Sequence, residues 1–143
     1  MECRKYLLIL TLALLCVVSI SAVSSAEFND EVVTGLNSTS DINQGLDAAH
    51  SLNKSVLLIF DQDSCYYCDL LKEDVLSNRD VQDILNENYI VVFVDINEQY
   101  DLAADFQVMG TPTCVILDSD GNNLSRIDGY VSGDEFLDAV KEI

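Results

Sequence analysis

A chain of 143 residues is long enough for a single domain whose core needs no disulfides to hold it together. It carries 25 acidic residues against 7 basic ones, a net charge of −18 at pH 7. Nucleic acid and anionic lipid are therefore excluded as expected partners, because both attract a basic surface. Solubility is the simpler interpretation of this charge, and an acidic docking surface for a basic partner is the alternative.

Residues 1–26 have the pattern of a secretory signal peptide. A basic start precedes an apolar stretch from Tyr6 to Ile20, and small residues follow. We expect cleavage after Ala26, which leaves 27–143 as one mature domain with 24 acidic and 5 basic residues. A retained membrane anchor is the alternative, because the apolar stretch approaches the ~18 residues of a membrane span. Either way, the domain is predicted to be secreted or extracytoplasmic, and to meet a membrane only if this segment is retained.

The mature chain is predicted to alternate strands and helices. Continuous apolar runs at 56–60 and 89–96 are typical of strands covered on both faces. The full order of expected elements is a strand at 31–36, a helix from Ile42 to Lys54, a strand at 56–60, a helix from Cys65, a short helix around 81–85, a strand at 89–96, a helix around 102–106, a hairpin of 114–118 with 124–128, and a helix at 133–143. This order predicts an α/β fold with a central mixed sheet and helices on both faces.

Two cysteines in a C-x-x-C motif, Cys65 and Cys68, directly follow the strand predicted at 56–60. This places Cys65 past the carboxyl end of a central strand and in the first turn of a helix, where sites form in open α/β sheets. The unpaired N–H groups and the dipole of a helix N-terminus stabilise a thiolate. Cys68, one turn later, is close enough to attack a mixed disulfide on Cys65. The motif therefore favours a redox dithiol, with Cys65 as nucleophile and Cys68 as resolving thiol.

Two other interpretations of the pair are weaker. A zinc site needs four ligands, and the mature chain offers only Cys114 and His50 beyond the pair, so we expect neither a metal nor another cofactor. His50 is expected to be a solvated surface residue. A permanent structural disulfide is disfavoured, because closing a two-residue loop removes little entropy from the unfolded chain.

Together these features resemble the thioredoxin superfamily, in which a strand ending in C-x-x-C is followed by a βαβ unit, a Thr-Pro loop, a hairpin and a last helix. The likeness covers 27–143 and is closest to exported thioredoxin-like proteins with a C-x-Y-C active site, on the segments VLLIFDQDSCYYCDLLKEDVL and GTPTCVILDSDGNNLSRIDGY. Spacing alone predicts only a turn at Pro112. The resemblance implies a cis Pro112 packed against the disulfide, with the Thr111 backbone binding an extended substrate segment.

The resemblance also implies roles for the cysteines. Cys65 is expected to be the exposed nucleophile, Cys68 the resolving thiol, and Cys114 a buried strand residue outside the redox pair. We further expect Tyr66 and Tyr67, which lie between the two active cysteines, to contact the substrate.

Two positions depart from the family pattern. Ile59 stands where cytosolic thioredoxins carry a buried carboxylate, and Ser64 stands where a tryptophan usually precedes the first cysteine. The nearby aspartates are either substitutes for that carboxylate or ordinary surface acids; they are Asp61, Asp63 and Asp69. Because their charges oppose a thiolate, we expect a moderately to strongly reducing couple.

The sequence therefore predicts a monomeric extracytoplasmic thiol-disulfide oxidoreductase that reduces or rearranges protein disulfides through Cys65 and Cys68. Its expected partners are disulfide-containing proteins and a membrane or thiol electron donor. Whether it serves many substrates or one is left open. The alternative is a redox-inactive thioredoxin-like module that holds a protein partner in the groove beside Thr111 and Pro112.

Overall fold

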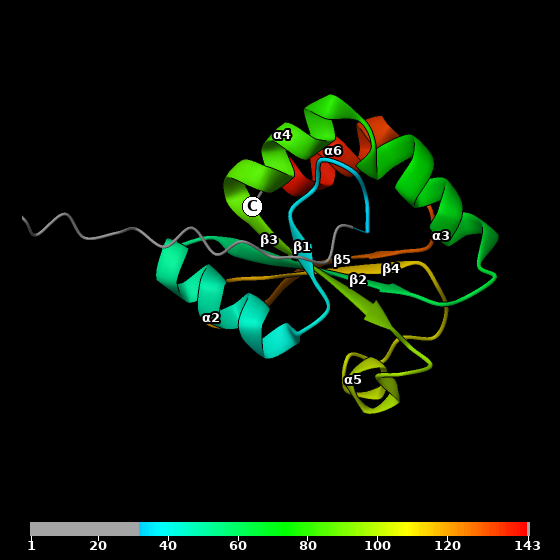
Figure 1. The fold of residues 1–143 in the computed structure, drawn as a ribbon, viewed down its shortest axis with the longest axis horizontal. Coiled ribbons are helices and arrows are strands. Elements are labelled where there is room, and N and C mark those ends of the chain that lie inside the picture. Colours follow the sequence, from blue (N-terminus) through cyan, green and yellow to red (C-terminus); the bar gives the residue numbers. More distant parts are fainter. Residues whose placement is uncertain (1–31, 143) are drawn as a thin grey trace, which may run out of the picture.

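The computed structural model describes residues 32–142, so the expected signal segment and the boundary after Ala26 lie outside the described residues. Within them, one five-stranded sheet in the order β1-β3-β2-β4-β5 has helices on both faces (Figure 1). No helix of this part is long and apolar enough to cross a membrane. The elements are β1 (Ser38–Thr39), α2 (Ile42–Leu52), β2 (Ser55–Asp61), α3 (Tyr66–Leu70), η1 (Leu71–Leu76), α4 (Arg79–Asn88), β3 (Tyr89–Asp95), α5 (Tyr100–Asp105), β4 (Thr113–Leu117), β5 (Asn123–Asp128) and α6 (Gly133–Lys141).

The centre of the sheet is β2, as the apolar run at 56–60 predicts. On one side β3 lies parallel to it, with Val56 opposite Ile90, and on the other side β4 lies antiparallel, with Ile59 opposite Cys114. β1 extends the sheet beyond β3, and β5 extends it beyond β4. The predicted mixed sheet with helices on both faces is confirmed.

The side chains of β2 alternate between two cores, one on each face of the sheet. Leu57 and Ile59 pack with side chains from η1, α4 and α6, whereas Val56, Leu58 and Phe60 pack with side chains from α2 and α5. None of these five residues is more than 1% exposed. The strand that leads into the cysteine motif is therefore anchored on both faces.

The strand expected at 31–36 is wrong in position. The described part of this segment forms a turn, and the edge strand is β1 instead. Gly35 has a φ of 87°, a left-handed conformation that strands do not use. Gln82 and Asn86 of α4 donate their side-chain amides to backbone carbonyls of this turn. The carbonyls that a strand would share with its neighbour are bound by a helix here.

The other expected helices form, with modest shifts at their ends. α2 ends at Leu52 rather than Lys54, because Asn53 takes a left-handed conformation with a φ of 53°. The helix expected from Cys65 consists of α3 followed by η1, a π-helical segment. π-Helical segments are rare and often occur at functional sites.

Candidate active site

The disulfide lies at the end of the central strand. β2 ends at Asp61, and Cys65 is the N-cap of α3, with an extended backbone before the helix begins at Tyr66. Cys65 and Cys68 form a disulfide, with their Cα atoms 5.2 Å apart. The structure thus brings together the two cysteines that the sequence assigns to the redox pair.

The helix presents a hydrogen-bond donor to the first cysteine. The backbone N–H of Cys68 donates to the Sγ atom of Cys65 at 3.1 Å. An N–H group that points at sulfur binds a thiolate more strongly than a neutral thiol, because the acceptor is then charged. This arrangement favours ionisation of Cys65 when the disulfide is reduced.

Cys65 is less accessible than we expected. It is 8% exposed and therefore buried, whereas we expected an exposed nucleophile, and Cys68 is 1% exposed. The loop that carries Thr111 lies against Cys65 and contributes to this enclosure. Cys65 nevertheless keeps the larger accessible fraction of the two.

The Thr111–Pro112 peptide bond is cis, as the resemblance implies. The Thr111 hydroxyl donates to Cys65 Sγ at 3.3 Å, so this loop contacts the disulfide through a side chain as well. The Pro112 carbonyl accepts a hydrogen bond from the backbone N–H of Gly129 at 2.8 Å. The loop is thereby fixed between the disulfide on one side and the chain following β5 on the other.

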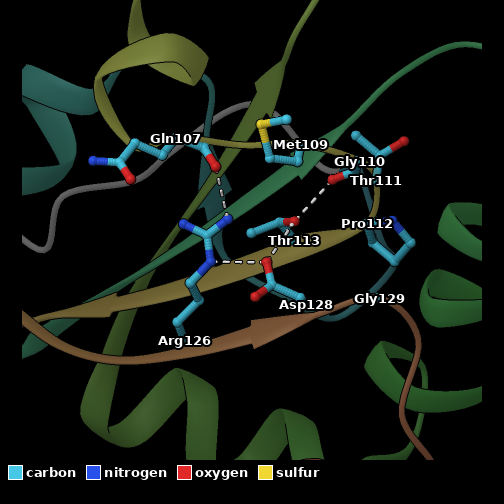
Figure 2. A pocket seen from close by; sticks show the side chains of 9 residues that line it. All are labelled: Gln107, Met109, Gly110, Thr111, Pro112, Thr113, Arg126, Asp128 and Gly129. Carbon is cyan, nitrogen blue, oxygen red and sulfur yellow. Dashed lines mark hydrogen bonds and ion pairs between the residues drawn. The ribbon is translucent and has the colours of Figure 1, made fainter.

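A groove of about 630 Å³ runs beside this loop (Figure 2). The residues that line it are Gln107, Met109, Gly110, Thr111, Pro112, Thr113, Arg126, Asp128 and Gly129. Thr111 and Pro112, which we expected to contact the substrate, both line this groove. The Met109 side chain is 94% exposed, which offers an apolar surface at the rim of the groove.

Sequence reasoning missed Arg126, which braces the loop before the cis-proline. Its guanidinium donates to the carbonyl of Phe106 at 2.6 Å. It also donates to the carbonyl of Gln107 at 3.2 Å, and its Nε atom lies 2.8 Å from Asp128 (Figure 2). Arg126 and Asp128 are two residues apart on β5, so they lie on the same face of the strand. The two-residue spacing could have predicted the ion pair between Arg126 and Asp128. It could not have predicted the bonds to the two carbonyls, because these lie 19 and 20 residues away along the chain.

Three tyrosines form an aromatic surface beside the disulfide. Tyr66 is 71% exposed and Tyr67 is 56% exposed, with ring centroids 5.3 Å apart. The Tyr67 ring also lies 6.3 Å from that of Tyr130, which sequence reasoning did not single out. The position of Tyr66 and Tyr67 is compatible with the expected contact with a substrate.

The aspartates near the motif differ in their surroundings. The Asp61 carboxylate is largely buried, with a side-chain exposure of 13%, and forms an ion pair with Lys72 of η1. Asp63 and Asp69 are exposed. Ile59 is in the core, so no carboxylate occupies its position. The charge of Asp61 is therefore offset by a lysine that the sequence analysis did not identify.

The third described cysteine, Cys114, is 1% exposed and lies opposite Ile59 across the sheet. It is outside the disulfide, and burial raises the pKa of its thiol to about 12. A buried thiol with this pKa stays neutral at physiological pH, and a neutral thiol is a poor nucleophile.

His50 is exposed on α2, as expected, with its Nδ1 atom 3.5 Å from a carboxylate oxygen of Asp120. Across residues 32–142, no three His, Cys, Asp or Glu side chains are grouped so that they could hold a metal ion.

The mixed sheet, the C-x-x-C disulfide at a helix start and the cis-proline loop beside it define a protein with a thioredoxin-like oxidoreductase fold. The sequence model of the thioredoxin-like domain matches residues 42–143, and the chain belongs to that family. This finding concerns the family as a whole, and the narrower likeness to exported C-x-Y-C proteins stays a prediction.

Individual proteins share the fold or part of the sequence. A thioredoxin from Thermus thermophilus is 27% identical and superposes with a TM-score of 0.65, over 71% of this chain and 82% of the thioredoxin. The DsbH oxidoreductase, 21% identical, shares the fold with a TM-score of 0.67, over 77% of this chain and 85% of that one. Mouse spermatogenesis-associated protein 20 is 32% identical over 59 residues, which are 41% of this chain but only 8% of the mouse protein.

Proposed function

We propose that this protein is an extracytoplasmic thiol-disulfide oxidoreductase that reduces or rearranges protein disulfides as a monomer. The observation that carries this proposal is the geometry at Cys65. Its sulfur accepts hydrogen bonds from the Cys68 N–H and from the Thr111 hydroxyl, and Thr111 also lines the groove beside Pro112. These donors favour a thiolate, and the groove offers room for an extended segment of a substrate.

The reaction is a pair of disulfide exchanges. The Cys65 thiolate attacks one sulfur of a substrate disulfide, forms a mixed disulfide and releases the other substrate sulfur as a thiolate, which takes up a proton. The Cys68 thiol then loses its proton and attacks Cys65 Sγ, which releases the second substrate thiol. The substrate gains two electrons and two protons, and the protein ends in the Cys65–Cys68 disulfide seen in the structure.

The oxidised protein needs a thiol donor for the next cycle. Outside the cytoplasm this donor is a small thiol or a membrane protein that relays electrons from within. We propose the extracytoplasmic location from the signal-peptide pattern of residues 1–26. Cell fractionation and N-terminal sequencing test it, and a purified secreted chain that begins at Glu27 is the expected result.

We propose that the couple works in the reducing direction. Hydrogen bonds to the thiolate stabilise the reduced form, whereas the exposed carboxylates of Asp63 and Asp69 oppose it. Lys72 and Arg126 form ion pairs with Asp61 and Asp128, which offset their positive charges. We therefore expect a potential below about −180 mV, the value typical of disulfide isomerases, and a higher measured value would contradict the proposed direction.

Trapping tests the roles of the two cysteines. Cys68→Ser is expected to accumulate mixed disulfides with substrate proteins, because nothing then resolves them, whereas Cys65→Ser is expected to form almost none. Cys114→Ala is the matched control and is expected to behave like the wild-type protein, since Cys114 is buried outside the pair. The opposite pattern, with trapping by Cys65→Ser, would reverse the assigned roles.

Insulin reduction separates this proposal from a redox-inactive binding module. With dithiothreitol as electron source, the wild-type protein is expected to speed insulin reduction and Cys65→Ser is expected to lose that effect. A wild-type protein that binds partners but leaves insulin reduction at the rate of dithiothreitol alone would favour the binding module.

A further inference from the structure

Several large apolar side chains are exposed on the segments that flank Cys65 and line the groove. Met109, Tyr66 and Tyr67 are each more than half exposed. The two tyrosines begin α3 directly after Cys65, and Met109 lines the groove together with Thr111, whose hydroxyl donates to Cys65 Sγ. Single exposed apolar residues are ordinary, but several gathered around one site indicate a contact surface. We call Met109, Tyr66, Tyr67 and Tyr130, together with the groove, the docking face.

Arg126, which lines the groove, and Lys72, in η1 directly after α3, are both bound within the protein. Lys72 is paired with Asp61. Arg126 uses its guanidinium on two backbone carbonyls and on Asp128. Their positive charges are therefore satisfied internally and are poorly placed to attract an anionic partner.

The remaining basic residues in 32–142 lie away from the docking face. Lys54 directly precedes the first residue of β2, at the other end of that strand from the cysteines, and donates to the carbonyl of Asn86. Lys141 lines a separate pocket with Tyr89, the first residue of β3. Arg79 begins α4, beyond the far end of η1. The docking face thus has no unpaired lysine or arginine from the described part of the chain.

Carboxylates, in contrast, border the face without a cationic partner. Asp63 lies two residues before Cys65, and Asp69 directly follows Cys68. Both are exposed, and no lysine, arginine or histidine of residues 32–142 forms an ion pair with either. The face therefore has an apolar centre and a border of net negative charge.

From this distribution we infer the substrate class: an extended, disulfide-bearing protein segment with an apolar side chain and with lysine or arginine next to its cysteine. The inference rests on the proposed function and specifies its substrate. The apolar side chain packs on Met109 and the tyrosines, while the basic residue approaches Asp63 and Asp69. Complementary charge acts mainly on the rate of encounter and on the choice of partner, so the preference depends on salt.

Three synthetic peptides test the inference. Each contains the same disulfide loop and one leucine, and they differ only in the two residues that flank the cysteines: lysine, glutamine or glutamate. With dithiothreitol as electron source at about 20 mM salt, we expect kcat/KM for the lysine peptide to exceed that for the glutamate peptide by about tenfold. At about 0.5 M salt the ratio is expected to fall below about threefold, because the Debye length shortens to a few ångströms.

Substitutions at Asp63 and Asp69 test whether these two carboxylates cause the preference for basic peptides. Asp63→Asn combined with Asp69→Asn is expected to lower the ratio of lysine to glutamine peptide by about threefold or more, a readout that cancels any change in the reactivity of Cys65 itself. Glu87→Gln is the matched control. Glu87 is an exposed acid near the end of α4, just before the first residue of β3, whereas the docking face lies past the last residue of β2. It is expected to leave the ratio unchanged.

The outcomes separate the inference from the function on which it rests. Equal kcat/KM values for the three peptides would overturn the inference and leave the proposed oxidoreductase intact. A ratio lowered as much by Glu87→Gln as by the double variant would also overturn it, since overall charge would then explain the preference. Failure to reduce any of the peptides, or insulin, would overturn the proposed function and this inference with it.

Discussion

At the scale of single residues, the Cys65 sulfur is the most informative atom of the site. It accepts one hydrogen bond from the first turn of α3 and another from Thr111, 46 residues away in the sequence. The first bond follows from local chain geometry, because a helix N-terminus always presents free N–H groups. The second bond adds a donor that only this side chain supplies.

Thr111→Val tests that donor, because valine keeps the shape of threonine and removes the hydroxyl. Loss of about 1.4 kcal/mol of thiolate stabilisation would make the reduction potential about 30 mV more negative. Redox equilibration with glutathione or dithiothreitol measures the shift. Thr111→Ser should restore most of the potential, and Thr34→Val, at an exposed threonine in the turn before β1, should not change it. A potential unchanged in Thr111→Val would show that the hydroxyl contributes nothing.

The buried Cys114 thiol is expected to make the free energy of unfolding depend on pH. Its thiol has a pKa of about 12 in the folded protein against an ordinary value of 9.0, because burial disfavours the thiolate. Above pH 9 the unfolded chain loses a proton that the folded protein retains, so the free energy of unfolding falls as pH rises. The slope from this group approaches about 1.4 kcal/mol per pH unit between pH 9 and 12 and vanishes below pH 8.

Urea unfolding of the oxidised protein at several pH values from 7 to 10.5 measures this effect. Cys114→Ala is expected to lack that part of the slope and to keep the rest of the pH dependence. Identical slopes in the two proteins would contradict the assignment to Cys114. In the native oxidised protein we also expect Cys114 to resist alkylation by iodoacetamide until the protein unfolds.

At the scale of elements, β5 supports the site through Arg126. The strand is at the edge of the sheet, yet its arginine binds the carbonyls of Phe106 and Gln107, which connect α5 to the cis-proline loop. Thr113 adds a bond from its hydroxyl to the Gly110 carbonyl at 2.8 Å. The loop beside the disulfide is therefore braced from the hairpin.

Arg126→Met keeps the aliphatic part of the side chain and removes the bonds to the loop. We expect a loss of about 2 kcal/mol in the free energy of unfolding, with faster amide hydrogen exchange across 107–113. If the loop binds the substrate as proposed, the KM for a disulfide peptide should rise several-fold with a smaller change in kcat, because the loop carries no reacting group. Arg79→Met, at an exposed arginine, is the control and should change stability by less than about 0.5 kcal/mol.

α2 packs closely against β3, which predicts that a larger residue at Gly45 destabilises the fold. A Cβ atom at Gly45 would lie 2.5 Å from a methyl group of Val92. Gly45→Ala is therefore expected to destabilise the fold by about 1–3 kcal/mol, although alanine is the better helix former. Gly133→Ala, where a Cβ meets nothing within 4 Å, should be neutral or slightly stabilising. Urea unfolding of both variants checks the contrast, and a stabilised Gly45→Ala would contradict it.

At the scale of the whole molecule, charge is the dominant feature. The net charge of −18 makes like-charge repulsion a general cost of the compact state. Raising the salt concentration from about 20 mM to 0.5 M is therefore expected to increase the Tm by about 5 °C. Asp83→Lys, on an exposed position of α4, should raise the Tm at low salt and reduce the salt effect. A Tm that falls with salt in both proteins would contradict this account.

Sequence alone located the central strand at 56–60, the redox pair that follows it and the order of the later elements. These features depend on local periodicity and on spacing, which neighbouring residues determine. The same local signals failed at 31–36, because Gln82 and Asn86 of a distant helix bind the carbonyls of that segment. Nothing near 31–36 in the sequence indicates that competition.

Only the tertiary structure decided how the site is assembled around the cysteines. The hydroxyl of Thr111 on Cys65, the brace from Arg126 and the pairing of Asp61 with Lys72 join side chains from separate elements. Their meeting depends on strand order and register, which bring β2, β4 and the loop before β4 to one edge of the sheet. The sequence by itself determined the C-x-x-C pair and its place after the central strand, because these depend on local order along the chain. The fold determined which other groups surround the Cys65 sulfur, because those groups come from distant segments.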